Sequence, residues 1–320
     1  MEANGKELAK QVTGNIGKVI VGRERTIKLL LAALLADGHV LLEDVPGTGK
    51  TKLSKTLARS LAAEFARIQF TPDLLPSDIT GLNIYDRQKN EFVLRKGPVF
   101  TNILLADEIN RATPRTQAGL LECMEERQVT IDGVTYGLGN PFFVIATQNP
   151  VETAGTFPLP EAQMDRFLMK LSMGLPDKAE ELDILARYMD KEPLNELHSI
   201  LTLEELQKAK EEVNQIFVHS CIQEYMVDII SATRSAEGVI MGASPRGSLA
   251  LLRCIKAYAY LDGRNFVIPD DVKQTVIPVL AHRIVLSYGF GSNSGKTSES
   301  EIFLKKIMEQ IKVPTEDFSV

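Results

Sequence analysis

Apolar positions in the first half of the chain fall into short continuous runs, separated by longer stretches with helical spacing. Most runs place Ile, Leu, Val or Phe at successive positions, which is typical of strands buried on both faces. Strands that alternate with helices in this way indicate a parallel sheet covered by helices. We therefore predict an α/β fold with a helix over 26–36 and a five-stranded parallel sheet. Its strands are expected at 39–43, 65–69, 103–107, 142–147 and 168–173.

Two segments interrupt this alternation and predict inserted β-hairpins. The first is expected over 82–95, around a polar turn at 87–90. The second is expected over 128–138, where Asp132-Gly133 favours the positive φ angles of a tight turn. Between them, 113–126 reads as a helix that begins with Thr and Pro.

The second half of the chain shows only helical spacing. The pattern predicts an α/β domain over 1–174, an all-α lid over 175–288, and a linker with a terminal helix over 289–320. Within these regions, helices are expected at 177–190, 202–217, 221–236, 244–262, 270–286 and, after the Gly/Ser-rich linker 289–300, at 301–312.

Composition narrows the classes of function. The 320 residues carry 36 Lys+Arg and 42 Asp+Glu, a net charge of -6, so nucleic acid is not expected as the main partner. The three cysteines form no CxxC pair, which indicates a reducing cytosol rather than a disulfide framework. The longest apolar run, 29–36, is far shorter than the roughly 20 residues of a membrane span, and no signal peptide is expected. We expect a cytoplasmic protein.

A phosphate-binding loop is predicted directly after the first strand, at the start of a helix over 50–63. Backbone amides of such a loop surround a polyphosphate, the lysine reaches the β- and γ-phosphates, and the hydroxyl binds Mg²⁺. Asp44 departs from the usual pattern, which has glycine there, and an ordinary glycine turn is the alternative. A second Gly-Lys-Thr, within 291–297, lies in the Gly/Ser linker and is expected to be only linker. The expected binding residues are Pro46, Gly47, Thr48, Gly49, Lys50 and Thr51.

The third predicted strand ends in two acids, Asp107 and Glu108. Ligands bind at this edge of α/β sheets, and successive side chains on a strand point in different directions. We expect Asp107 to serve the Mg²⁺ shell, together with Thr51, and Glu108 to act as general base toward water. A strand that simply turns toward solvent is the alternative.

Five motifs together resemble the MoxR family of AAA+ ATPases, over about residues 10–288. They recur in the order that the family shows, and the family tolerates Asp44. The resemblance implies a P-loop AAA+ core with a helical lid, and Mg²⁺-dependent hydrolysis of ATP between them. The motifs are 42–47 (LEDVPG), 97–126 around LLADEINRA, 146–150 (ATQNP), 159–167 (LPEAQMDRF) and 242–246 (GASPR).

The resemblance also implies roles for single residues. Asn149 corresponds to sensor 1, which helps position the attacking water. Arg166 corresponds to the arginine finger, which acts on the ATP of a neighbouring subunit. Arg246 corresponds to sensor 2, which reaches from the lid to the phosphates, and Val21-Gly22 corresponds to the segment that lines the adenine.

The same resemblance implies partners. A finger acting on a neighbour implies a homo-oligomeric ring, with a hexamer expected. Family members act on protein clients by chaperone-like remodelling or metal-cofactor insertion, often with a von Willebrand factor A domain protein.

Other readings stay open on sequence alone. A P-loop small-molecule kinase or GTPase would share the loop, although the Asn-Lys-x-Asp guanine signature is absent from the sequence. A scaffold switched by ATP, with little turnover, and a DNA translocase are further alternatives. Arg111 and Arg115 either contact a neighbouring subunit or lie on a solvated helix face, and no histidine is expected to bind a metal.

Overall fold

The computed structural model describes residues 4–150, 155–287, 298–316 and 318. Its centre is a five-stranded sheet in the order β2-β5-β8-β1-β9, in which every pair of neighbours is parallel. All five predicted strands are present, and two of them have the predicted bounds. The strands are β1 (Val40–Glu43), β2 (Phe65–Gln69), β5 (Ile103–Asp107), β8 (Phe143–Gln148) and β9 (Met169–Leu171).

Successive residues of the central strands contribute to opposite sides of the sheet. Val40 and Leu42 belong to one hydrophobic cluster, whereas Leu41 between them belongs to another. Leu104 and Leu105 divide in the same way. Continuous apolar runs arise because both faces of these strands are buried.

Helices cover both faces of the sheet. The helix α1 (Gly5–Gly17), which the pattern did not predict, contacts α2 (Glu24–Leu35) and α3 (Lys50–Ser60). On the other face, residues of α5 (Pro114–Glu126) join the cluster around Leu104. The remaining core helices are α4 (Pro76–Thr80), the short α6 (Glu161–Met164) and the 3-10 turn η1 (Ile109–Arg111).

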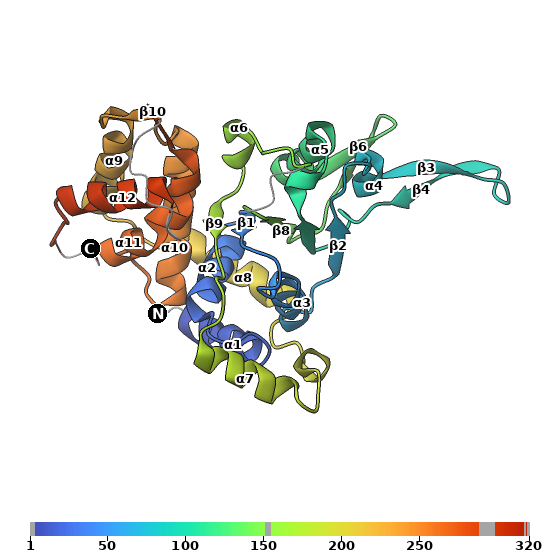
Figure 1. Ribbon diagram of the computed structural model, residues 1–320, viewed down its shortest axis with the longest axis horizontal. Helices are drawn as coiled ribbons and strands as arrows, with labels where there is room; N and C mark the ends of the chain where they lie inside the picture. The colour runs from blue at the N-terminus through green and yellow to red at the C-terminus, as the bar shows by residue number, and fades with distance from the viewer. Residues whose placement is uncertain (1–3, 151–154, 288–297, 317, 319–320) are drawn as a thin grey trace.

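Both predicted hairpins form. The first joins β3 (Gly81–Asp86) to β4 (Glu91–Lys96) and projects well away from the sheet (Figure 1). The second joins β6 (Gln128–Ile131) to β7 (Val134–Gly137) through Asp132-Gly133, both of which have positive φ angles.

The lid is helical as predicted, with one addition. The strands β10 (Val239–Met241) and β11 (Val285–Leu286) pair antiparallel, where the pattern predicted helices only. The predicted helix 270–286 is too long, because the observed helix, α11 (Pro269–Leu280), ends six residues earlier and a 3-10 turn, η3 (Ala281–Arg283), leads into β11. The other elements of this half are α7 (Lys178–Tyr188), η2 (Pro193–Glu196), α8 (Leu203–Asn214), α9 (Ser220–Ser235), α10 (Pro245–Leu261), α11 (Pro269–Leu280) and α12 (Glu299–Gln310).

The lid packs directly on the core. α10 contacts α1, α2 and α8, and a single hydrophobic cluster runs from Leu8 in α1 to Ile307 in α12. The start of α10 consequently lies beside the core, at Glu125 and Asp165. The second Gly-Lys-Thr segment, 291–297, lies outside the described residues.

Candidate active site

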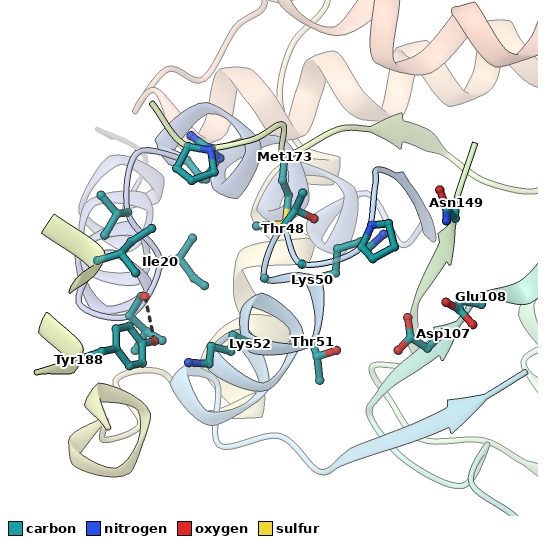
Figure 2. Close-up of a pocket in the computed structure, with 18 residues that line it drawn as sticks. Ile20, Thr48, Lys50, Thr51, Lys52, Asp107, Glu108, Asn149, Met173 and Tyr188 are labelled. Atoms are coloured by element: carbon teal, nitrogen blue, oxygen red, sulfur yellow. Dashed lines mark hydrogen bonds between the residues drawn. The ribbon is translucent and has the colours of Figure 1, made fainter. Parts of the chain in front are cut away.

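A cavity of about 510 Å³ lies at the carboxyl ends of the strands, over the start of α3. In Figure 2, Asp107, Glu108 and Asn149 lie at one end, and Ile20 and Tyr188 lie at the other. All the predicted loop residues, Pro46 through Thr51, line the cavity between these two ends. The structure thus brings the loop, the two acids and Asn149 to one cavity.

Two glycines give the loop its shape. Gly47 and Gly49 have φ angles of 87° and 90°, in the left-handed region where a side chain is disfavoured. Gly49 is the N-cap of α3, so the first amides of that helix and the positive end of its dipole face the cavity. This arrangement suits an anion.

Lys50 lies between the loop and the acidic end of the cavity. Its ammonium donates to the carbonyl oxygen of Asp44 at 2.7 Å. Burial lowers the pKa of Lys50 from its ordinary value, while the charges of Asp44, Asp107 and Glu108 oppose that shift. These carboxylates favour the charged form of the lysine, which is the form that binds phosphate.

A threonine that sequence reasoning missed fixes both acids. The Thr147 hydroxyl on β8 donates to Asp107 Oδ1 at 2.7 Å and accepts from the Glu108 amide at 2.8 Å. Glu108 has a φ angle of 56°, which is rare for a residue with a side chain and often marks functional sites. Thr147 thereby holds a backbone turn that points two successive carboxylates into one cavity.

Side chains from neighbouring elements hold the other carboxylate oxygens. Arg67 on β2 donates to Asp107 Oδ2 at 2.7 Å. Gln69 on β2 and Arg111 in η1 donate to Glu108 Oε2 at 2.7 Å and 3.1 Å. Arg111 thus contacts a site residue of its own chain, and Arg115 is exposed on α5. The polar positions of β2 were the only signal in the sequence for Arg67 and Gln69.

Oxygen ligands suited to Mg²⁺ are present. The hydroxyl of Thr51 and the carboxylate of Asp107 both line the cavity, and hard oxygen donors are what Mg²⁺ requires. Each carboxylate oxygen has two lone pairs, so the bonds from Arg67 and Thr147 leave Asp107 able to accept further. These residues fit the metal that the sequence predicted.

The far end of the cavity is apolar and suits a nucleobase. Val21 lines it, as do Ile184 and Tyr188 from α7. Gly22, predicted with Val21 to contact the base, is not among the lining residues; it has a φ angle of 67°, and a side chain there would collide with Glu180. Asn149, which is 8% exposed, closes the opposite end.

The two remaining predicted residues lie in a different cavity. A hollow of about 460 Å³ is lined by Arg166 and Arg246, and neither lines the P-loop cavity within the described part of the chain. We predicted that Arg246 reaches the phosphates from the lid. Instead, it forms a bidentate ion pair with Glu125 at 3.0 Å and 3.2 Å, because α10 packs on α2 and directs its start toward the end of α5.

This second hollow, hereafter the arginine cavity, is rich in positive charge. Arg127, Arg253 and Arg283 line it together with Arg166 and Arg246. Arg283 is buried, and it donates to the Asp165 carboxylate at 2.6 Å and to the Phe167 carbonyl at 2.7 Å. Arg283 therefore fixes the turn that carries Arg166, whose guanidinium donates to the Leu121 carbonyl at 3.0 Å.

Other classes of site find no support in the described residues. They include no group of three or more His, Cys, Asp or Glu side chains that could hold a metal ion. None of their helices has the length and hydrophobicity needed to cross a bilayer. The three cysteines are free thiols, and burial raises the pKa of Cys123 and Cys254 to about 12.

Comparison with known proteins agrees with this geometry. Residues 39–169 match the ATPase family associated with various cellular activities (AAA), and residues 231–302 match the AAA lid domain. The chain is 49% identical to the uncharacterized protein YeaC of Bacillus subtilis, over 96% of this chain and 95% of that protein. It is 42% identical to Chaperone MoxR1 of Mycobacterium tuberculosis, over 93% of this chain and 80% of that protein.

A solved structure shares the whole architecture. The crystal structure of a protein from Cytophaga hutchinsonii, named as a candidate ATPase, superposes with a TM-score of 0.89. Its sequence is 38% identical, and the match covers 97% of this chain and 96% of that one. Together with the cavity at the P-loop, these similarities show that the chain belongs to the MoxR family of AAA ATPases.

Proposed function

We propose that this protein hydrolyses Mg²⁺-ATP as an oligomeric ring and uses the cycle to remodel protein clients. One observation carries the proposal: Lys50, Glu108 and Asn149, which come from three separate motifs, line one cavity. Membership of the AAA ATPase family implies that the protein binds and hydrolyses ATP. The catalytic roles, the metal, the ring and the client are the parts that we propose.

Each side chain of the P-loop cavity has a distinct task in this proposal. The loop amides and Lys50 bind the β- and γ-phosphates, and Val21 and Tyr188 contact the base. Glu108 accepts a proton from the attacking water, which Asn149 orients. Thr51 and Asp107 would hold Mg²⁺, which would supply neutralisation of the phosphate charge.

A second copy of the chain would complete the site. Phosphoryl transfer is accelerated by an arginine that stabilises charge on the γ-phosphate. Arg166 and Arg246 lie in the arginine cavity of the same chain, so we propose that they serve the ATP of a neighbour. Contacts of this head-to-tail kind close into rings, and we propose a hexamer.

The exposed face of α7 supports such an assembly. Leu182, Leu185 and Met189 are 58%, 64% and 77% exposed and follow each other at helical spacing. Ile184 and Tyr188, on the same helix, line the P-loop cavity. An apolar surface of this kind beside a nucleotide site is expected to be covered by another protein surface.

The client and partner follow from relatives and from composition. One relative is named a chaperone, and we propose chaperone-like remodelling here, with insertion of a metal cofactor as a narrower form. A von Willebrand factor A domain protein is the proposed partner. The net charge of -6 does not favour nucleic acid.

The test separates binding from turnover. Glu108→Gln should bind ATP with near-normal affinity and hydrolyse it at least about 100-fold more slowly, because an amide cannot accept the proton. Lys50→Ala should abolish binding in a titration with fluorescent ATP, and Lys296→Ala, in the other Gly-Lys-Thr, is the matched control. Wild-type turnover in Glu108→Gln would refute the role of Glu108 as general base, whereas ATP binding without turnover in the wild-type protein would favour a scaffold.

A further inference from the structure

Asp44 occupies the position where the P-loop pattern has its first glycine. Gly47 and Gly49 have positive φ angles, but Asp44 does not. The backbone therefore does not require glycine at position 44, and a side chain can be placed there without strain. Asp44 is buried, with 6% of its residue surface exposed, so its carboxylate must find its partners inside the protein.

Three donors from one short segment satisfy that carboxylate. The Ser172 hydroxyl and the Gly174 amide donate to Oδ1 at 2.6 Å and 3.0 Å. The Met173 amide donates to Oδ2 at 2.7 Å. Charge-assisted hydrogen bonds of this length are stronger than bonds between neutral groups. Asp44 thus binds the segment 172–174 at three successive residues.

The backbone of Asp44 joins two further parts of the site. Its amide donates to the Gln148 carbonyl at 3.2 Å, next to Asn149 on the neighbouring strand. Its carbonyl accepts from the Lys50 ammonium at 2.7 Å. One residue therefore connects the catalytic end of the cavity, the lysine, and the chain that leads to α7.

The segment held by Asp44 forms part of the cavity wall. Met173 and Pro176 line the cavity, and the chain then enters α7, which contributes Ile184 and Tyr188 to the apolar end. Figure 2 shows Met173 above the loop, near Thr48. Displacement of 172–174 would therefore open the wall that faces the nucleotide.

We propose that Asp44 is a positioning residue for nucleotide binding, whose carboxylate holds the segment 172–174 against the P-loop and so completes the cavity wall. This inference rests on the proposed ATP site. It assigns a task to the residue at which this chain departs from the common P-loop pattern. Glycine there would leave two backbone amides and a hydroxyl without their acceptor, at a cost for each buried group.

The decisive variants are Asp44→Asn and Asp44→Gly. Asparagine keeps the shape but turns one acceptor into a donor that faces a donor. Glycine restores the common P-loop sequence, so it should be harmless if position 44 matters only for the loop. Glu43→Gln is the matched control, since it alters the adjacent 2.8 Å pair with Lys170 between the same two strands, outside the cavity lining.

Two measurements test the proposal on the full chain. Hydrogen exchange without nucleotide should show loss of protection at residues 173 and 174 in both Asp44 variants, with the strands unchanged. ATP binding should weaken about tenfold in each, the effect of losing roughly one charged hydrogen bond. In turnover assays, KM should rise while kcat at saturating ATP stays close to wild type. Partial misfolding would instead lower the active fraction and leave KM unchanged.

The outcomes are separable. Wild-type affinity in Asp44→Gly, or unchanged protection at 173 and 174, would overturn the positioning role. If either variant does not fold, Ser172→Ala removes one donor, and it should weaken ATP binding about threefold; unchanged binding there would also overturn it. Failure of the wild-type protein to bind ATP would instead refute the proposed function. The two failures can be told apart, because the exchange measurement tests the Asp44 contacts without nucleotide.

Discussion

The P-loop cavity and the arginine cavity have similar volumes, about 510 Å³ and 460 Å³, but they are built differently. The first is built mainly from a loop and the adjoining ends of neighbouring strands, and it holds carboxylates beside one lysine of the loop. The second collects five arginines from distant parts of the sequence. The first contains the phosphate loop, two acids and Asn149. The second contains no phosphate loop, and its arginines lie beside Asp37, Glu125 and Asp165. In the ring proposed above, the P-loop cavity of one copy and the arginine cavity of the next together form one catalytic site.

Among the variants that test this comparison of the two cavities, Arg166→Ala should have the largest effect on ATP hydrolysis. If it serves a neighbour's ATP, Arg166→Ala should lower hydrolysis about 10³-fold and leave ATP affinity nearly unchanged. Mixing Arg166→Ala with Glu108→Gln protomers should restore activity, because some interfaces then combine an intact Glu108 with an intact Arg166. Mixed rings seen by native mass spectrometry without recovered activity would contradict the shared site. Full activity of Arg166→Ala as a dilute monomer would leave Arg166 as a structural residue.

The P-loop cavity could be predicted from sequence because its signals are local. The loop, the acidic strand end and Asn149 each follow a strand, and parallel strands bring their carboxyl ends to one edge. Roles for Thr147 and Gln69 could not be predicted from sequence, since their contacts with the two acids depend on which strands become neighbours. β5 lies between β2 and β8, and only this order puts both side chains beside the acids.

The arginine cavity and parts of the lid show where sequence reasoning fails. Arg246 was assigned to a motif from sequence, but its location depends on how α10 packs on α2, which no local pattern encodes. The strands β10 and β11 are very short and pair across more than 40 residues, so neither gives a period-2 signal. The helix α1 was missed although Leu8, Val12 and Ile16 have helical spacing, because three glycines lie in it. The domain boundary at 174 stays a prediction.

The pH dependence of stability is the next largest expected effect, and it concerns the wall of the arginine cavity. His39 is buried: its Nε2–H donates to the Met124 carbonyl, its Nδ1 accepts from the Val144 amide, and its pKa is lowered to about 4, mainly by burial and also by Arg127. The unfolded chain therefore binds more protons between pH 6.5 and about 4, so the free energy of unfolding should fall by about 3 kcal/mol as the pH drops through that range. Urea denaturation at several pH values measures it.

A histidine variant tests that assignment. His39→Gln should reduce this pH dependence, while His198→Gln, at an exposed position, should keep it. An unchanged pH profile in His39→Gln would show that the acid sensitivity comes from other groups. Half-buried His282, whose pKa burial also lowers well below its ordinary value, would be the first to examine.

The Arg246→Ala variant tests the same separation of the two cavities, with a smaller expected effect on hydrolysis. Its ion pair with Glu125 holds it away from its own P-loop, so Arg246→Ala should leave ATP affinity of the dilute protein unchanged and lower hydrolysis in the assembled protein about tenfold. Arg253→Ala, seven residues later on α10 and exposed, controls for the loss of one positive charge in the same cavity. Weaker ATP binding by dilute Arg246→Ala would mean that the lid reaches its own nucleotide after all.

The β3–β4 hairpin should have the smallest effect on hydrolysis, because it belongs to neither cavity. Tyr85 and Phe92 are 50% and 73% exposed, and their rings meet edge to face across the two strands, 5.4 Å apart. Replacement of both with Ala should remove this pair and leave basal ATPase within about twofold, since surface changes away from a site cost little.

Client handling should suffer instead, because the hairpin projects from the body of the protein with its apolar side chains exposed (Figure 1). The double variant should therefore be compared with wild type for basal turnover and for ATPase stimulated by client. Loss of basal turnover in a folded double variant would contradict this prediction. It would show that the hairpin affects the catalytic site, most directly through β4 and the segment that leads from it into β5 and Asp107.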